Sequence, residues 1–315
     1  MNTRPDPYRK IAVIRLGSLG DFVQAMGPFK SIRAQHPKAH ITLVTTAPFA
    51  KLGRASGYFD EVWDDGRAPW PSFRMLHFLS ALRGAHFDFV YDLQTSNRTS
   101  WYFQFLWPKR PGWSGVAGGC SHPHDNPNRI PMHTVDRQAE QLRIAGLTEI
   151  YPTDLSWMTA NVSAFALPER YAVLVPGGSP HRPAKRWPAE RYAALAERLV
   201  ADGITPVLLG ANAEQSELAT IADRVPDAIN LCGQTDFQQI VAIGTGATLA
   251  VGNDTGPMHL LAASGCPCLI LFSHDSDPSR CAPRAKEVAT LRRPTLEDLA
   301  LDDVTHALTE MGTLA

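Results

Sequence analysis

The sequence is poor in the features that mark disulfide-rich, membrane-spanning and nucleic-acid-binding proteins. Its five cysteines are odd in number and show no paired CxxC spacing, which argues against a disulfide framework and a zinc site. The formal net charge is -1, whereas nucleic-acid-binding domains usually carry a basic excess. No apolar run approaches the roughly 20 residues that span a bilayer, and residues 1–7 lack the apolar core of a signal peptide. We therefore expect a cytoplasmic protein without a nucleic-acid partner.

The chain of 315 residues exceeds the usual size of one domain, which favours two domains. Short apolar runs alternate with helical segments in both halves, a pattern that predicts α/β units with parallel sheets. The expected strands are 11–16, 41–44, 61–63 and 87–93 in the first half, and 171–175, 206–210, 228–231, 248–251 and 268–272 in the second. Proline breaks between 151 and 169 mark the expected linker, so we predict domains at 1–160 and 161–315.

Prolines and glycines crowd residues 107–132, which we interpret as one long irregular loop. Four potential metal ligands lie in or just after it, but their irregular spacing favours solvent-facing side chains over a metal site: Cys120, His122, His124 and His133.

The segment 248–259 is the most informative part of the chain. An apolar run ends in a polar turn and is followed by Pro257, which suits the first position of a helix because its missing N–H has no intrahelical partner there. Thr255 or Gly256 can cap that helix. Free N–H groups and the positive end of the helix dipole would then bind a phosphate. A capped helix without a ligand is the alternative.

A second glycine-containing turn, Gly17-Ser18-Leu19-Gly20-Asp21, follows the first expected strand. The two glycines allow a tight turn and the close approach of a ligand. Asp21 at a helix start is either an N-cap or a general base for a bound hydroxyl, and both roles are compatible. The turn is neither a GxGxxG fingerprint nor a Walker A loop, which argues against a nicotinamide dehydrogenase.

A third turn contains Gly177 and Gly178 and directly follows the strand at 171–175. Lys185, a few residues further on, is a compact cation that suits phosphate oxygens, although a solvated loop lysine is the alternative. Because ligands of open parallel sheets bind beyond the carboxyl ends of the strands, we expect this loop and the turn at 254–256 to share one crevice.

In their order, the segments 15–21, 176–188, 233–235 and 253–259 resemble those of glycosyltransferase family 9, the ADP-heptose:lipopolysaccharide heptosyltransferases. The resemblance covers nearly the whole chain. It implies a GT-B architecture, in which two Rossmann-like domains face a central cleft with the acceptor on the N-terminal side and the nucleotide sugar on the C-terminal side. It also implies an inverting reaction without a metal or other cofactor, and a last helix at about 296–308 that packs back towards the N-terminal domain.

Carried over to this sequence, the resemblance makes Asp21 the catalytic base and Lys185 the phosphate-contacting lysine. The residues expected to bind substrate are Gly17, Ser18, Gly20, Gly177, Gly178, Lys185, Asp254, Thr255, Gly256 and His259. One departure is Ser273, which stands where family members commonly have glycine in a loop leading to Asp277-Pro278.

The implied activity is transfer of heptose from ADP-heptose to a lipopolysaccharide inner-core acceptor linked to lipid A. Transfer from another nucleotide sugar or to another acceptor, and a nucleotide-sugar-binding protein without activity, are the alternatives. A membrane-embedded acceptor also implies peripheral contact with the inner face of the cytoplasmic membrane. Three arginines of the first half either contact an anionic substrate or are ordinary surface residues: Arg110, Arg129 and Arg137. The aromatic residues of the same half either form an apolar membrane-binding patch or pack in the core: Trp70, Phe73, Phe78, Trp101, Tyr102, Phe103, Phe105 and Trp107.

Overall fold

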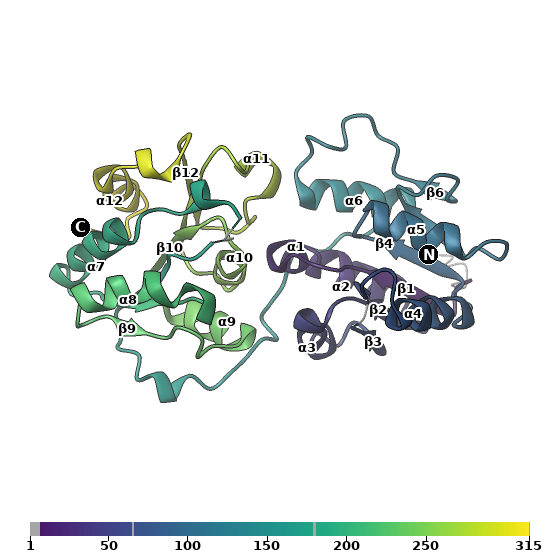
Figure 1. The fold of residues 1–315 in the computed structure, drawn as a ribbon, viewed down its shortest axis with the longest axis horizontal. Coiled ribbons are helices and arrows are strands. Elements are labelled where there is room, and N and C mark those ends of the chain that lie inside the picture. Colours follow the sequence, from purple (N-terminus) through teal and green to yellow (C-terminus); the bar gives the residue numbers. More distant parts are fainter. Residues whose placement is uncertain (1–6, 65, 179–180, 315) are drawn as a thin grey trace. The chain divides into compact units, whose positions relative to one another are not determined.

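The computed structural model describes residues 7–64, 66–178 and 181–314 (Figure 1). It divides the chain into two compact units, unit 1 (Met1–Asp154) and unit 2 (Leu155–Ala315). The division falls inside the segment 151–169, where the linker was expected. Among the described residues, no helix has both the length and the apolar character required to cross a membrane.

Unit 1 is built on a six-stranded sheet of order β3-β2-β1-β4-β5-β6, and every paired strand is parallel to its neighbour. Its strands are β1 Lys10–Ile14, β2 His40–Val44, β3 Glu61–Trp63, β4 Phe89–Asp92, β5 Gly112–Gly115 and β6 His122–Pro123. Its helices are α1 Leu19–Gln24, α2 Met26–Gln35, α3 Ala47–Ala55, α4 Phe73–Gly84, α5 Asn97–Phe105 and α6 Thr134–Ile144. The helical segment that follows the first glycine turn is divided into two helices, α1 and α2.

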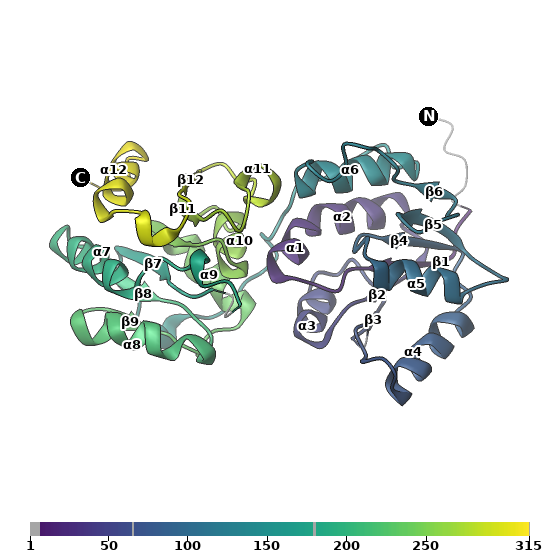
Figure 2. The same ribbon diagram turned by 45° about the horizontal axis from the view of Figure 1, so that its top comes forward.

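Helices cover both faces of the unit 1 sheet (Figure 2). On one face, α4 and α5 bury Phe78 and Phe103 against sheet residues that include Ile14 and Trp113. On the other, α1, α2 and α6 pack against one another. Burial on both faces explains why β1 and β4 are almost continuously apolar, as the central strands of a doubly wound sheet are.

Unit 2 repeats this plan with a parallel sheet of order β12-β11-β10-β7-β8-β9. Its strands are β7 Tyr171–Val175, β8 Thr205–Leu208, β9 Ile229–Asn230, β10 Leu249–Asn253, β11 Cys268–Phe272 and β12 Val288–Arg292. Its helices are α7 Ala189–Ala201, α8 Gln215–Arg224, α9 Phe237–Gly246, α10 Gly256–Ala263, α11 Pro278–Cys281 and α12 Leu301–Glu310. Helices α7, α8 and α12 share one core with the sheet, and α10 packs on α9 and on β10.

The last helix, α12, has its buried side chains in unit 2, and the expected packing of this helix towards unit 1 stays a prediction. Val304 and Leu308 of α12 are fully buried in the core of unit 2, and α12 packs against α7 (Figure 1). The apolar face of this helix is thus occupied within its own unit.

Three strands were not predicted. β5 and β6 lie within residues 107–132, which were interpreted as one irregular loop, and β12 lies beyond the last expected strand. β5 and β6 have the sequences Gly-Trp-Ser-Gly and His-Pro, which are too short and too poor in β-branched residues to show a strand pattern. They form because the exposed edge of β4 offers free backbone groups for pairing.

Strand β4 ends on a buried carboxylate that closes the turn into α5. Asp92 Oδ1 accepts the N–H groups of Gln94 (3.1 Å) and Thr95 (2.9 Å), whereas Oδ2 is buried without a hydrogen-bond partner among the described residues. Burial raises the pKa of Asp92 to about 6, although the backbone hydrogen bonds and the nearby Arg15 favour its charged form.

This carboxylate makes stability depend on pH. Because the folded state binds the proton of Asp92 more tightly than the unfolded chain does, the free energy of unfolding falls as the pH rises from about 4 to about 6, by up to about 3 kcal/mol from this group. Asp92→Asn removes this slope and keeps an oxygen for the two N–H groups. We expect urea unfolding to show that the wild type loses stability relative to Asp92→Asn over this range.

Asp125→Asn, which removes an exposed carboxylate of the same unit, is the control for the loss of a charge. A stability difference between Asp92→Asn and the wild type that stays constant from about pH 4 to pH 7 contradicts the prediction.

Candidate functional site

The expected site residues lie at equivalent places in the two sheets. Each sheet has the strand order of a Rossmann fold. The order in which successive strands are added to the sheet reverses between β1 and β4 in unit 1 and between β7 and β10 in unit 2. Ligands of such sheets bind beyond the carboxyl ends of the strands at this switch point. The first glycine turn follows β1, and the other two predicted turns follow β7 and β10.

The turn after β1 requires glycine at its first position. Gly17 has φ +115°, and a Cβ atom there would lie 2.6 Å from the ring of Phe49. Ser18 caps α1, and Gly20 is buried in its first turn. Asp21 is the third residue of α1, not its N-cap, and its Oδ2 accepts the backbone N–H of Ser18 (3.3 Å) and the Ser18 hydroxyl (3.2 Å). The helix start therefore orients the carboxylate, which remains 40% exposed.

Arg15 fixes the other oxygen of this carboxylate. Its Nη2 lies 3.0 Å from Asp21 Oδ1, and its Nη1 donates to the carbonyl oxygen of Leu93 (2.5 Å), just beyond β4. Burial lowers the pKa of Arg15, while Asp21 and Asp92 act to raise it. An arginine remains protonated under such shifts. Arg15 thus joins the ends of β1 and β4 and holds Asp21 towards the switch point.

Of the three arginines considered as anion contacts, Arg129 reaches the loop that follows β4. Its guanidinium donates to Thr95 Oγ1 (2.5 Å) and to His124 Nδ1 (3.2 Å). Arg110 instead bonds to Gln104 at the end of α5, and Arg137 bonds to Thr134 within α6. The residues 107–132 therefore contribute one half-buried cation near the switch point of unit 1.

In unit 2, a single buried amide organises the corresponding place. Asn253, the last residue of β10, donates from Nδ2 to the carbonyl oxygens of Pro176 (2.8 Å) and Gly177 (3.0 Å). Its Oδ1 accepts the backbone N–H of Trp187 (3.1 Å) and the hydroxyl of Tyr192 (3.1 Å). These bonds connect the ends of β7 and β10 with the segment that leads into α7.

Lys185 and Asp254 meet as a consequence. Lys185 Nζ lies 2.7 Å from Asp254 Oδ2, and the two side chains are only 12% and 10% exposed. The following residue, Arg186, pairs with Glu217 (2.5 Å) and donates to the carbonyl oxygen of Gly178 (2.8 Å). The structure thus brings together Lys185 and the turn after β10, as expected, and Asp254 orients the Lys185 ammonium group.

The N-terminus of α10 follows Asp254 directly. Thr255 is its N-cap, Gly256 its first residue and Pro257 its second, one position later than predicted. Thr255 Oγ1 is buried and has no hydrogen-bond partner among the described residues, and no side chain caps the first turn. His259 lies within α10 and is buried. The first turn of α10 therefore presents N–H groups and an unused hydroxyl beside Lys185.

The glycines of the turn after β7 have side chains of other residues close to them. A Cβ atom on Gly177 would lie 1.9 Å from Glu214 Oε1, and one on Gly178 would lie 3.2 Å from Arg186. Ser179 and Pro180, which follow them, lie outside the described residues. Larger residues at either glycine would displace the side chains that surround Lys185.

The potential metal ligands have other partners. Cys120 donates to Gly115, His122 contacts Ser121, and His133 caps α6. In the part of the chain that the structure describes, no three His, Cys, Asp or Glu side chains are placed to hold a metal ion.

The divergent loop after β11 keeps a defined geometry. Ser273 is buried and its hydroxyl accepts the N–H of Asp275 (3.3 Å), and Asp277 caps α11 through the N–H of Ser279 (3.0 Å). The substitution of glycine by Ser273 thus replaces backbone freedom with a side-chain hydrogen bond.

Two residues that position the site were not singled out from the sequence. Arg15 and Asn253 lie inside recognised motifs, but their partners, Leu93 and Pro176, are 78 and 77 residues away. A polar residue at the end of an otherwise apolar strand was the available signal, because burial there requires a hydrogen-bond partner.

Comparison with known proteins relates this geometry to one family. The sequence model of glycosyltransferase family 9 (heptosyltransferase) matches residues 75–304. Lipooligosaccharide heptosyltransferase 2 of Haemophilus ducreyi is 36% identical over 121 residues; this match covers 36% of the present chain and spans only 35% of that protein's length. Lipopolysaccharide heptosyltransferase 2 of Escherichia coli K12 is 25% identical over 317 residues, which cover 90% of this chain and 88% of that protein.

A solved structure shows the same fold. The ADP-heptose lipopolysaccharide heptosyltransferase II of E. coli superimposes with a TM-score of 0.77 at 21% identity, covering 96% of this chain and 98% of that one. The predicted α/β class with two Rossmann-like domains is thereby confirmed. Because the family model extends over more than half of its length, this chain belongs to glycosyltransferase family 9, the heptosyltransferases.

Proposed function

We propose that this protein is an inverting glycosyltransferase that transfers heptose from ADP-heptose to an inner-core sugar of a lipopolysaccharide acceptor. One observation carries the proposal: each half of the family's motif set lies at the switch point of its own sheet, where Rossmann-like sheets bind ligands. In this proposal unit 1 binds the acceptor and unit 2 binds the nucleotide sugar. The names of the relatives, lipopolysaccharide and lipooligosaccharide heptosyltransferases, support this choice of substrates.

Asp21 is the proposed general base. It accepts the proton of the acceptor hydroxyl as the hydroxyl oxygen attacks the anomeric carbon of the heptose. The bond between that carbon and the β-phosphate oxygen breaks on the opposite face, so the anomeric configuration inverts and ADP leaves with the electron pair. Arg15 and Ser18 hold the carboxylate in the orientation that this transfer needs.

Lys185 and the first turn of α10 stabilise the departing diphosphate. The ammonium group exchanges Asp254 for a phosphate oxygen, while the helix N-terminus and Thr255 Oγ1 donate to the others. A cation and a helix dipole then supply the charge stabilisation that a metal ion supplies elsewhere. We therefore propose a metal-independent reaction at the cytoplasmic face of the membrane, where the enzyme contacts its lipid-linked acceptor.

Replacing the base tests the unit 1 half of the site. Asp21→Asn keeps an oxygen for the capping bond to Ser18 but cannot take a proton, so we expect kcat to fall by about 10²- to 10⁴-fold. ADP affinity should stay close to wild type, because the change does not touch unit 2, whereas the thermal midpoint should fall, because the buried Arg15 loses one of the two carboxylates that offset its burial. Near-normal transfer by Asp21→Asn with a competent acceptor would exclude this residue as the base.

Replacing the lysine tests the unit 2 half. Lys185→Met removes a charge-assisted hydrogen bond worth about 1.5–3 kcal/mol, so we expect ADP binding to weaken by about tenfold or more. Lys286→Met, which removes a lysine that is 92% exposed, is the matched control and should bind ADP as the wild type does. Equal ADP affinities of the two variants, measured by calorimetry, would refute the phosphate contact.

Donor choice and metal independence are tested together by calorimetric titration with ADP-heptose and with UDP-sugars, each in excess chelator. We expect ADP-heptose to bind and the UDP-sugars not to bind. The chelator should leave the affinity for ADP-heptose unchanged, because Lys185 and α10 supply the positive charge. Binding of UDP-sugars only, or binding that needs an added divalent ion, would overturn the donor or the mechanism.

A further inference from the structure

The aromatic stretch in the first half of the chain divides between core and surface. Phe78, Tyr102 and Phe103 are buried, as core packing predicts. Eight large hydrophobic side chains are exposed in the described part of the chain, and six of them lie between residues 70 and 107: Trp70, Phe73, Leu76, Trp101, Phe105 and Trp107, which we call the aromatic surface. Phe73 is 91% and Trp101 71% exposed.

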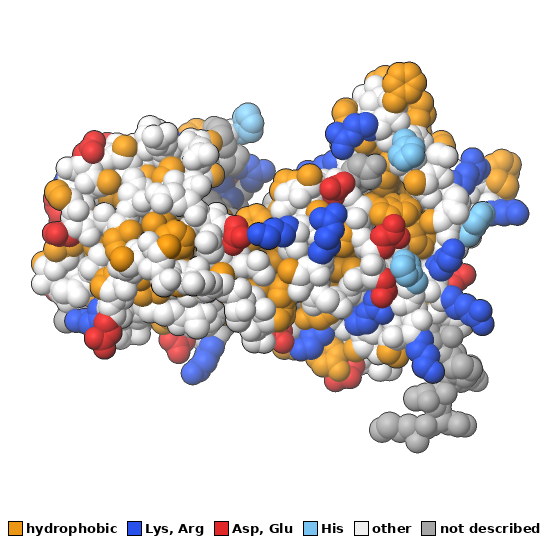
Figure 3. Space-filling model, turned by 90° about the horizontal axis from the view of Figure 1, so that it is seen from below, with side chains coloured by type: hydrophobic (Ala, Val, Ile, Leu, Met, Phe, Trp, Pro, Cys, Tyr) orange, Lys and Arg blue, Asp and Glu red, His pale blue; other side chains and the backbone are white. Residues whose placement is uncertain are grey.

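Part of the aromatic surface bridges two helices. Trp70, Trp101 and Phe105 line one pocket of about 270 Å³ between α4 and α5. Figure 2 shows α4 standing out from the rest of unit 1, and Figure 3 shows hydrophobic side chains gathered at the projecting edge of the right-hand unit beside Lys, Arg and His side chains. An apolar area of this extent marks an interaction site on a soluble protein.

Positive charge surrounds this surface. Between residues 66 and 110 the sequence holds six Lys and Arg residues and two acidic ones, Asp88 and Asp92, and neither α4 nor α5 contains an acidic residue. Asp92 is buried, and Asp88 accepts the backbone N–H groups of Arg9 and Lys10. The cations of α4 and α5 therefore have no acidic partner on these two helices.

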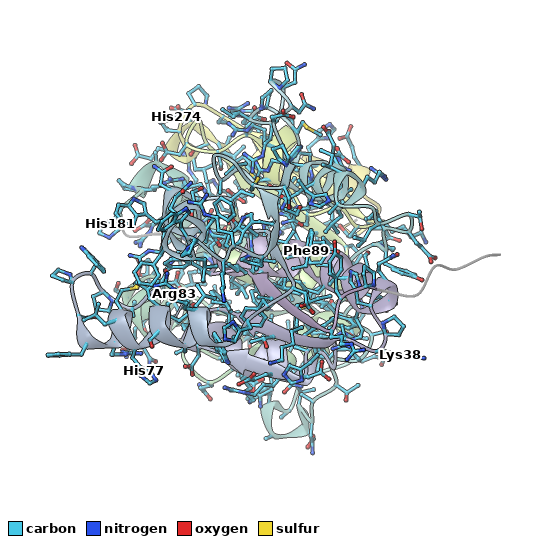
Figure 4. The ribbon with its side chains drawn as sticks, turned by 90° about the vertical axis from the view of Figure 1, so that its right-hand side faces the viewer. Lys38, His77, Arg83, Phe89, His181 and His274 are labelled. Carbon is cyan, nitrogen blue, oxygen red and sulfur yellow. The ribbon has the colours of Figure 1, made fainter. Side chains whose placement is uncertain are left out.

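Two of these cations are fixed to the aromatic residues. The guanidinium of Arg83, on α4, lies 5.6 Å from the ring centre of Phe105 and donates to the carbonyl oxygen of Trp107. That of Arg110 lies 4.7 Å from the ring centre of Phe103. Figure 4 labels Arg83 and His77 on α4, from which they project on different sides. Arg83 is thus held against Phe105 of the aromatic surface, and Arg110 against the buried Phe103 on the same helix as Phe105.

We propose that the aromatic surface docks onto a bilayer that contains anionic lipids. Its tryptophan and phenylalanine rings enter the interface between head groups and acyl chains, where such side chains are enriched, and the neighbouring Arg and Lys side chains contact lipid phosphates. A second copy of the chain fits less well, because a two-fold contact would bring two basic faces together without acidic partners. The inference rests on the proposed function in one respect, since it locates the membrane contact of an enzyme with a lipid-linked acceptor.

Vesicle sedimentation tests the surface with the full-length protein. We expect binding to phosphatidylethanolamine vesicles that contain phosphatidylglycerol, weaker binding without the anionic lipid, and release by salt. Phe73→Ser should lower the partition coefficient by about tenfold or more, the effect of withholding one phenylalanine from an apolar phase. Arg74→Glu should lower it for anionic vesicles only.

Ile130→Ser is the matched control, because Ile130 is 67% exposed in the same unit but lies outside the aromatic surface. Equal partition of Phe73→Ser and Ile130→Ser would overturn the proposal, as would failure of the wild type to bind anionic vesicles at low salt. A dimer in solution that Phe73→Ser dissociates would assign the surface to self-association instead and also overturn it.

A soluble, deacylated acceptor separates this inference from the proposed function. Phe73→Ser should turn over that acceptor at the wild-type rate, because Phe73 is remote in sequence and role from Asp21 and its partners. Absence of wild-type turnover with this acceptor would count against the proposed activity whatever the vesicles show. A loss of turnover confined to Phe73→Ser would place the residue in acceptor binding and refute a pure docking role.

Discussion

The hydrogen bonds of one buried amide determine the geometry of unit 2. Asn253 joins the ends of β7 and β10 to the segment before α7 through four bonds of 2.8–3.1 Å. Each bond satisfies a group that would cost about 1–3 kcal/mol if it stayed buried and unpaired. Asp254 is the neighbour of Asn253 in sequence, and Lys185 precedes Trp187 by two residues. The 2.7 Å ion pair between Lys185 and Asp254 therefore follows from where the amide places the two backbone segments.

In unit 1, a buried cation connects the ends of the two central strands. Arg15 bridges the ends of β1 and β4 through Leu93 and holds the carboxylate of Asp21. Removing an arginine from water is costly, and here the two nearby carboxylates and a carbonyl oxygen offset the cost. This difference between the two units fits the proposed chemistry. The residues in unit 1 would have to keep a carboxylate oriented, and those in unit 2 would have to keep a cation available. In the proposed mechanism, both arrangements would orient the reactive group before substrate binds.

Much of this framework was predictable because its causes are local. Apolar runs specify β7 and β11 to the residue, and the glycines directly after β1 and β7 mark the turns that end these strands. β5 and β6 were missed, since they depend on pairing with β4 and leave no pattern of their own. The sequence likewise placed Asp21 at a helix start without revealing that Ser18 would be the cap. The bond of Arg15 to Leu93 and those of Asn253 to Pro176 and Gly177 span more than 75 residues, so no local pattern contains them.

Helix α4 shows why sequence alone could not separate core from surface aromatics. Its inward residues, Met75, Phe78, Leu79 and Leu82, follow the spacing of one helix face, whereas Phe73 and Leu76 lie among the polar residues of the outward side. Periodicity identifies the inward face of such a helix, but it does not show that the aromatic residues outside that face are exposed. The inward residues suffice to anchor α4 on the sheet, so the outward ones contribute little to folding. Hydrophobic side chains that folding does not require, set among cations without acidic partners on the same helices, are the physical signature of a surface selected for binding.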